Sequence, residues 1–395
     1  MDYQSTTPLD PRVWDVMEVC YKEHFGNAAS RTHAYGLKSE EIVEKARHQI
    51  ADLIHASSSE IIFTSGATES NNLALKGLAS RYRDKGNHII TCVTEHRAVL
   101  DTCQFLEQQG FAVTYLPVSS LGILDVQKLL EAITGKTILI SVMAANNEIG
   151  VLQPISEIGK IAKEKDIAFH TDAAQAVGKI PMDVEAMGID LMSLSAHKMY
   201  GPKGIGALYV RNHHPRIKLD PLLHGGGHEG GLRSGTLNVP EIAGFGKACE
   251  IASHEMQSES QRTWVLREKL LKGICGQLDD VYVNGDRVHR LPNNLNLSFD
   301  YLEGESLLMG IKDSLAVSSG SACSSAKMEP SHVLKALGLA EHLIYSSIRF
   351  GIGRFTTEEE INYAAEKVVE VVRRQRESSP LYEMARKSVG VRKNF

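Results

Sequence analysis

The sequence lacks the features that define several common classes of protein. It has no Cys-x-x-Cys pair, and its six cysteines are scattered: Cys20, Cys92, Cys103, Cys249, Cys275 and Cys323. Such a distribution argues against a disulfide framework and a structural zinc site, and it fits a reducing compartment. No apolar run approaches the length that spans a bilayer. The formal charge of −5 provides no basic surface for nucleic acid. We therefore expect no metal site, no membrane contact and no direct nucleic-acid binding.

The chain also begins without a secretory signal, which favours the cytoplasm. The alternative is the mitochondrial matrix, for a protein whose targeting segment has been removed. At 395 residues the chain is long enough for two domains. We predict a large domain over residues 11–255 and a smaller one formed by residues 1–10 and 256–395.

Short apolar runs alternate with amphipathic stretches over the first half of the chain. The runs that predict strands lie at residues 60–64, 88–94, 111–118, 137–143, 167–170, 189–194 and 206–210. This alternation indicates βαβ units and an α/β fold with a mainly parallel seven-stranded sheet flanked by helices. A second helix is predicted from Ser39 to Ala56, with Ser39 as its cap. A long helix from Pro240 to about Asp279 leads into a smaller α+β part.

Four side chains that can take part in catalysis or ligand binding each follow a different predicted strand: His96, Asn147, Asp172 and Lys198. The ends of parallel strands meet at one edge of a sheet, where α/β folds bind ligands. A lysine desolvated there has a lowered pKa and can form a Schiff base with a carbonyl compound. Each residue also has a structural interpretation: a solvated lysine, a helix-capping Asp, an amide that caps a turn, or a structural histidine.

A strand–glycine–helix transition at Gly66 has the geometry that binds phosphate through free helix amides. The amides of Ala67 and Thr68 would point at the phosphate, unless the turn is an ordinary one with a Thr cap.

Two arginines are candidates for binding a carboxylate. Arg349 is flanked by apolar residues and needs a bidentate partner, either a substrate or an internal Asp or Glu. Arg31 is equally well explained as a solvated loop residue.

Cys323 lies in a run of Ser, Gly and Ala, the most polar and flexible stretch of the chain. Free cysteines are usually buried, so an exposed thiol in such a loop is a candidate nucleophile.

Taken in order, seven motifs resemble the class V aminotransferase group of fold-type I pyridoxal-phosphate enzymes, and within it the cysteine desulfurases of the NifS/IscS type. The motifs lie at residues 6–8, 64–72, 146–150, 170–175, 195–198, 233–236 and 318–323. The resemblance implies that Lys198 holds pyridoxal 5′-phosphate as a Schiff base. It further implies the following roles: the phosphate is held by Ala67, Thr68, Ser195 and His197, the pyridine nitrogen by Asp172, the phenolic oxygen side by Gln175 and Asn147, and the ring face by His96.

The same resemblance implies a homodimer, because Thr236 would reach the phosphate of the neighbouring subunit. The carboxylate of L-cysteine would bind Arg349, helped by Arg31 and Asn147. Cys323 would then take the sulfur as a persulfide and release L-alanine, with Lys198 moving the Cα proton and His96 beside the reacting atoms. The expected sulfur acceptors are an iron–sulfur scaffold protein and tRNA-thiolation enzymes, and Cys323 would transiently ligate a nascent cluster.

The sequence departs from this family at a few places. Ala28 and Ala29 replace a Gly-Asn-Pro type of turn, and Gly230 stands where Arg is usual. Ala145 replaces Val, Ser324 replaces Thr, and the end of the chain, residues 389–395, lacks the usual last segment. The competing hypotheses are an aminotransferase or selenocysteine lyase on the same fold, neither of which needs a mobile cysteine, and a cofactor-free scaffold protein.

Overall fold

The computed structural model describes residues 1–213, 216–302, 306–319, 329–380 and 382–384. Cys323, Ser324 and residues 389–395 lie outside these ranges. None of the described helices is both long enough and apolar enough to cross a membrane.

The first half of the chain forms a sheet of seven strands in the order β1-β7-β6-β5-β4-β2-β3. The strands from β6 to β3 are parallel, and β7 runs antiparallel to both of its neighbours. The mainly parallel seven-stranded sheet expected from the sequence is therefore confirmed. The strands are β1 (Ile61–Thr64), β2 (His88–Cys92), β3 (Ala112–Leu116), β4 (Thr137–Ser141), β5 (Ala168–Asp172), β6 (Leu191–Ser195) and β7 (Gly206–Val210).

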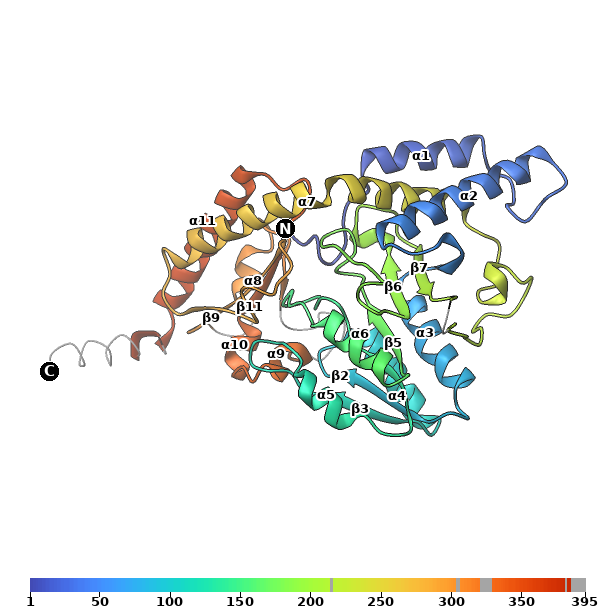
Figure 1. Cartoon of the computed structure of the whole chain (residues 1–395). Helices are drawn as coiled ribbons and strands as arrows, with labels where there is room; N and C mark the ends of the chain where they lie inside the picture. Colours follow the sequence, from blue (N-terminus) through green and yellow to red (C-terminus); the bar gives the residue numbers. More distant parts are fainter. Residues whose placement is uncertain (214–215, 303–305, 320–328, 381, 385–395) are drawn as a thin grey trace.

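Helices cover both faces of this sheet (Figure 1). Neighbouring residues of one strand contribute to different cores: Ile90 packs on the α2 and α6 side, whereas Ile89 packs on the α3 and α4 side. Coverage of both faces explains why the parallel strands read as continuous apolar runs. The helices are α1 (Pro11–Lys22), α2 (Ala34–Leu53), α3 (Ala67–Arg81), α4 (Arg97–Gln108), α5 (Val126–Ala132) and α6 (Ile155–Glu164).

The predicted start of α2 was wrong. The helix begins at Ala34, and its cap is His33, whose Nδ1 accepts a hydrogen bond of 3.1 Å from Gly36 N. Ser39 lies inside the helix, where its hydroxyl donates to the carbonyl of His24. A histidine cap is rare, so the sequence favoured the serine.

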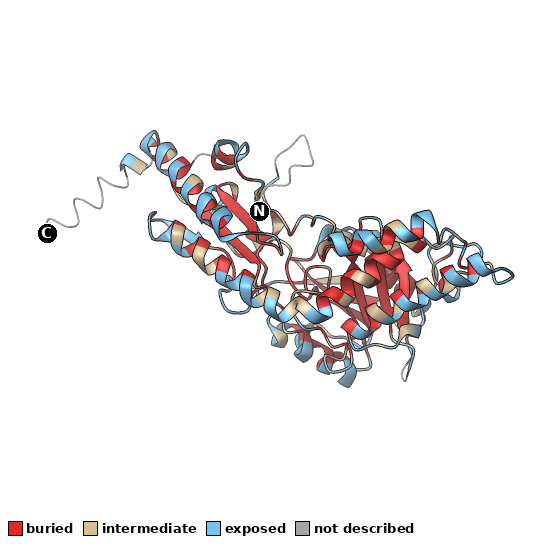
Figure 2. Ribbon diagram, turned by 90° about the horizontal axis from the view of Figure 1, so that it is seen from above, coloured by how far each residue is buried: buried red, intermediate tan, exposed pale blue. Residues whose placement is uncertain are grey.

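The second half of the chain builds a separate antiparallel sheet in the order β10-β11-β9-β8, with its own apolar core. Figure 2 shows the buried strands of both sheets in red. The elements of this part are β8 (Val281–Val283), β9 (Asn294–Phe299), α8 (Ser306–Ile311), β10 (Ser318–Ser319), α9 (His332–Ala336), α10 (Glu341–Tyr345), β11 (Ser347–Gly351) and α11 (Glu358–Glu377).

One helix of 37 residues, α7 (Val239–Cys275), belongs to both parts. Its first half packs with α1 and α2 in the core of the large sheet, and its last turns pack with α11 in the core of the small sheet. In Figure 1 it extends from α1 and α2 to α11. A domain boundary at residue 255 falls within this helix.

Candidate active site

A cavity of about 620 Å³ opens where the strands of the large sheet end. Its walls come from four sources: the ends of β5 and β6, the loops after β2 and β4, the start of α3, and the N-terminal segment 4–6. Arg349, from β11 of the small sheet, closes one side. Of the predicted site residues, the cavity brings together Ala67, Thr68, His96, Asn147, Asp172, Gln175, Ser195, His197, Lys198 and Arg349.

Lys198 ends a single 3-10 turn, Ala196–Lys198, that directly follows β6. Its Nζ donates hydrogen bonds of 2.7 Å to the carbonyls of Gln4 and Ser5. Burial, reinforced by the charge of Arg349, lowers the pKa of the Lys198 ammonium to about 8. At pH 7 about a tenth of such a lysine is the neutral, nucleophilic amine, a far larger fraction than for a lysine with the ordinary pKa.

The first turn of α3 lines the same cavity. Gly66 caps this helix with φ 149° and without a side-chain hydrogen bond, so the turn presents backbone amides. Gly206 of β7 packs directly behind: a Cβ there would lie 2.6 Å from Gly66 Cα and 2.5 Å from the Leu194 carbonyl. Only glycine therefore allows β7 to hold this turn in place.

His197 and Ser195 lie beside this turn. The His197 Nδ1 is 3.1 Å from the Thr6 hydroxyl. Burial, together with the charge of Lys198, lowers the pKa of His197 to about 4. The imidazole is thus neutral at physiological pH and offers a hydrogen bond rather than a charge.

Asp172 ends β5 and is buried. Its Oδ2 accepts 2.7 Å from the side chain of Asn71, and its Oδ1 accepts 3.0 Å from Ala174 N. Gln175 follows one turn later, and its Nε2 donates 3.0 Å to the same Gln4 carbonyl that Lys198 uses. The carboxylate and the amide are thus fixed in position.

The two adjacent amides after β4 have different roles. Asn146 is buried and caps the following turn, since its Oδ1 accepts from Glu148 N and Ile149 N. Asn147 lines the cavity, and its carbonyl accepts 2.8 Å from Arg349 Nη1. Of the two, Asn146 is thus the amide that caps the turn, and only Asn147 lies at the cavity.

His96 caps α4, with its Nδ1 accepting 3.1 Å from Ala98 N, while its ring lines the cavity. Beneath it, Glu95 is wholly buried, and burial raises the pKa of its carboxyl well above the ordinary value. Its Oε1 accepts 2.6 Å from Met143 N. Glu95 therefore ties the loop after β2 to the loop after β4.

Two predicted residues do not reach this cavity within the chain. Thr236 is exposed in the loop before α7. Arg31 is 80 % exposed and pairs with Glu40 at 3.4 Å, because the start of α2 holds it there. Arg31 instead lines a second, larger cavity of about 900 Å³.

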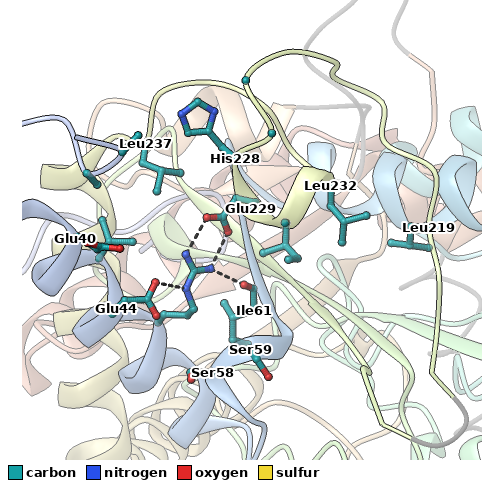
Figure 3. A pocket seen from close by; sticks show the side chains of 18 of the residues that line it. Glu40, Glu44, Ser58, Ser59, Ile61, Leu219, His228, Glu229, Leu232 and Leu237 are labelled. Carbon is teal, nitrogen blue, oxygen red and sulfur yellow. Dashed lines mark hydrogen bonds and ion pairs between the residues drawn. The ribbon is translucent and has the colours of Figure 1, made fainter. Parts of the chain in front are cut away.

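The larger cavity is organised by a buried ion pair between Arg47 and Glu229. The Arg47 guanidinium contacts Glu229 at 2.7 Å, the Ile61 carbonyl at 2.6 Å and Glu44 at 3.1 Å, the dashed lines of Figure 3. Gly230 lines the same cavity with φ 61° and open space around its Cα. The pair is satisfied by its own contacts together with Glu44, the Ile61 carbonyl and Phe63 N, and the cavity contains none of the predicted catalytic residues.

None of the described cysteines lines the cavity that contains Lys198. Four are buried and one, Cys275, is exposed at the end of α7. Burial raises the pKa of Cys92 to about 11 and that of Cys103 to about 12, so these thiols stay protonated and unreactive. The predicted nucleophile Cys323 lies outside the described residues.

The residues of the cavity fit a phosphorylated pyridine aldehyde. The helix turn without a side-chain cap and the hydrogen-bonding side chains of Ser195 and His197 suit the phosphate. A buried carboxylate ends β5, and an amine of lowered pKa follows β6. Sequence reasoning missed the N-terminal segment 4–6 and Asn71. These residues lie in or next to the motifs at 6–8 and 64–72, but their connection with the site depends on contacts between parts of the chain that are far apart in the sequence.

The chain was compared with known proteins. The model of the family "Aminotransferase class-V" matches residues 1–363. The chain belongs to this family. A relative named cysteine desulfurase IscS, from Anaeromyxobacter dehalogenans, is 58 % identical over 98 % of this chain and 96 % of its own length. The human relative named cysteine desulfurase is 56 % identical over 99 % of this chain and 85 % of its own length.

Solved structures from the same comparison agree with this membership. A structure described as a NifS-like protein has a TM-score of 0.87 at 38 % identity, over 94 % of this chain and 98 % of its own. One described as SspA in complex with cysteine has a TM-score of 0.79 at 40 % identity, over 90 % of this chain and 99 % of its own. The fold-type I architecture expected from the motifs is therefore confirmed.

Proposed function

We propose that this chain is a pyridoxal-phosphate-dependent cysteine desulfurase that converts L-cysteine to L-alanine and carries the removed sulfur as a persulfide on Cys323. The observation that carries the proposal is Lys198, an amine of lowered pKa at the floor of a cavity whose other walls are suited to phosphate, pyridine and carboxylate. The near full-length relatives named cysteine desulfurase support the choice of reaction.

Pyridoxal 5′-phosphate is the cofactor, and when bound it supplies an electron sink for the substrate Cα. Lys198 holds it covalently. The α3 amides of Ala67 and Thr68, with Ser195 and His197, bind the phosphate. Asp172 would keep the ring nitrogen protonated, Gln175 and Asn147 would serve the phenolic oxygen side, and His96 would lie on the ring face.

Arg349 and Asn147 orient the substrate through its carboxylate. The Lys198 Nζ, as an amine of lowered pKa in the cavity, would accept the Cα proton of the substrate and return it. The Cys323 thiolate attacks the substrate sulfur, so that an S–S bond forms as the substrate C–S bond breaks. The electron pair of that bond remains with the substrate carbon, which becomes the methyl group of alanine after protonation.

The partners follow from the same chemistry. We infer a homodimer in which Thr236, exposed and outside its own cavity, completes the phosphate site of the second subunit. The role of Arg31 in binding the carboxylate stays a prediction, because in the single chain it lies elsewhere. We infer transfer of the persulfide to an iron–sulfur scaffold protein and to tRNA-thiolation enzymes, with Cys323 transiently ligating a nascent cluster.

For the compartment we propose the cytoplasm. The relatives include bacterial proteins and one named as mitochondrial from Arabidopsis thaliana.

The test measures sulfide and alanine released from L-cysteine in the presence of a reductant. Wild type is compared with Cys323→Ala and with Cys275→Ala, which removes the exposed cysteine of α7. We expect release by wild type and Cys275→Ala and none by Cys323→Ala. A Cys323→Ala protein that still releases sulfide would contradict the persulfide. A yellow wild type that releases none would support an aminotransferase or selenocysteine lyase instead.

A further inference from the structure

The guanidinium of Arg349 is held from one side by a carboxylate of its own chain. Its Nη2 donates 2.9 Å to Asp2 Oδ1, 2.7 Å to the Ser5 hydroxyl and 2.8 Å to the Ser318 hydroxyl. The Ser318 hydroxyl in turn donates 2.9 Å to the same Asp2 oxygen. Asp2, Ser5 and Ser318 therefore form a closed polar cluster around one nitrogen of Arg349.

The hydrogen bonds of this cluster occupy both N–H groups of Nη2, so that Nη1 is the donor available to a ligand. An arginine terminal nitrogen has two N–H groups, and Nη2 already serves three acceptors. Nη1 gives one N–H to the Asn147 carbonyl at 2.8 Å, and Nε is buried without a partner. The remaining N–H of Nη1 lies beside Asn147, which lines the cavity with Arg349.

Asp2 is itself placed by the backbone of the small sheet. The segment around it runs along the end of β11: Gly351 N donates 3.0 Å to the Met1 carbonyl, and Tyr3 N donates 3.3 Å to the Gly351 carbonyl. Arg349 lies two residues before Gly351 on this strand. The acid and the arginine are therefore held by one local piece of structure, which does not depend on a bound substrate.

We propose that Asp2 is a positioning residue for the substrate: it fixes the rotation of the Arg349 guanidinium so that Nη1 faces the substrate carboxylate. This inference rests on the proposed function for the identity of the substrate. Asp2 itself makes no contact with substrate in this scheme. Its carboxylate also forms an ion pair of 2.9 Å with Arg349.

The opposite interpretation is that Asp2 competes with the substrate for Arg349. In that case removing Asp2 would strengthen substrate binding. The geometry favours positioning, because Asp2 contacts only Nη2, whereas Nη1, beside Asn147, keeps an N–H for a ligand. A charge-assisted hydrogen bond to an arginine is among the stronger polar contacts, so its loss should be measurable.

Asp2 also acts on the catalytic lysine through its charge. Arg349 lowers the pKa of Lys198, and the negative charge of Asp2 raises it. Replacing Asp2 by a neutral residue is therefore expected to lower the pKa of Lys198 further. This second effect can be read in the cofactor-free protein, and a purely structural role of Asp2 would not produce it.

The experiment compares Asp2→Ala and Asp2→Asn with wild type and with Asp15→Ala, an exposed acid on α1. We expect Asp2→Ala to raise KM for L-cysteine roughly tenfold with little change in kcat. Asp2→Asn keeps an acceptor oxygen and is expected to fall between wild type and Asp2→Ala. Asp15→Ala should match wild type.

Two further measurements keep the outcomes distinct. The affinity of the cofactor-loaded protein for L-alanine, followed by absorbance, should fall in Asp2→Ala even if no sulfide is released. The pH at which the cofactor-free Asp2→Asn protein begins to take up pyridoxal phosphate should shift downward. Should Asp2→Ala not fold, Ser5→Ala is expected to raise KM in the same direction with a smaller amplitude.

An unchanged or lower KM in Asp2→Ala would overturn the proposal, and a lower KM would establish competition instead. A loss confined to kcat would also overturn it. Absence of sulfide from wild type concerns the proposed function alone, because the binding of L-alanine still tests Asp2.

Discussion

The side-chain amide of Asn71, on the second turn of α3, donates a hydrogen bond of 2.7 Å to the carboxylate of Asp172 at the end of β5. The bond joins the helix whose first turn is proposed to bind the phosphate with the residue proposed to contact the pyridine nitrogen. This buried hydrogen bond therefore fixes the position of Asp172 relative to the start of α3.

Asn71→Ala is expected to lower kcat/KM by roughly tenfold or more, because a hydrogen bond to a charged, buried group is lost and Asp172 is free to turn. The absorbance of the bound cofactor should shift as well. Asn72→Ala is the matched control, since Asn72 donates only to the Thr68 carbonyl within its own helix. Equal effects of the two substitutions would contradict the assignment.

The lowered pKa of Lys198 predicts how the cofactor-free protein responds to pH. Its ordinary value of 10.5 falls to about 8 in the folded chain. The rate of pyridoxal-phosphate uptake should rise about tenfold per unit of pH below 8 and level off above it. Rapid-mixing absorbance measures this rate. Lys198→Ala should show no Schiff-base band, and Lys163→Met, an exposed lysine of α6, should retain the wild-type profile. A profile that rises steadily to pH 10 would contradict a perturbed lysine.

The same shift acts on stability. Between pH 8 and 10.5 the unfolded chain keeps a proton on Lys198 and the folded chain does not, so this lysine's contribution to the free energy of unfolding rises with pH across that window. Urea titrations of the cofactor-free wild type and of Lys198→Met at several pH values isolate the contribution. A difference between the two proteins that does not change with pH would contradict it.

The ion pair of Arg47 and Glu229 should be the most sensitive polar contact outside the active site. Only 11 % and 2 % of these side chains are exposed, and Glu229 also accepts 2.7 Å from Phe63 N on β1. Glu229→Gln leaves a buried charge without its partner and is expected to cost about 3 kcal/mol in the free energy of unfolding. Glu44→Gln, which removes the more exposed partner of the same arginine, should cost less than about 1 kcal/mol. Denaturant unfolding measures the free energy of unfolding of both variants. Similar losses in Glu229→Gln and Glu44→Gln would show that burial of the ion pair contributes little to stability.

The approach of β7 to the start of α3 can be tested at Gly206. Gly206→Ala would place a Cβ against two backbone segments that cannot move apart, at a cost of about 2 kcal/mol or more. Because one of these segments is the Gly66 turn, affinity for pyridoxal phosphate should fall together with stability. Gly135→Ala has open space around it and an ordinary φ, and should change neither property. Normal cofactor affinity in a folded Gly206→Ala protein would contradict this role of the contact.

Sequence reasoning recovered most of the large sheet because its strands and helices are encoded locally. The run at 206–210 and the start of α3 after Gly66 fall where the pattern placed them. The error at α2 arose where a histidine capped the helix and a serine did not. The partner of Arg349 could not be predicted, since Asp2 is far away in the sequence and the contact depends on how the chain ends fold together.

The long helix α7 connects the two parts of the chain, because it contributes to the apolar core of each. At about 1.5 Å per residue, its 37 residues extend through both apolar cores without interruption. Lys198 belongs to the part built on the large sheet and Arg349 to the part built on the small one, so the helix and the contacts of Arg349 with Asn147 and Ser5 hold the amine and the guanidinium at one separation. Swinging the small sheet away from the large one would require both bending α7 and breaking these contacts.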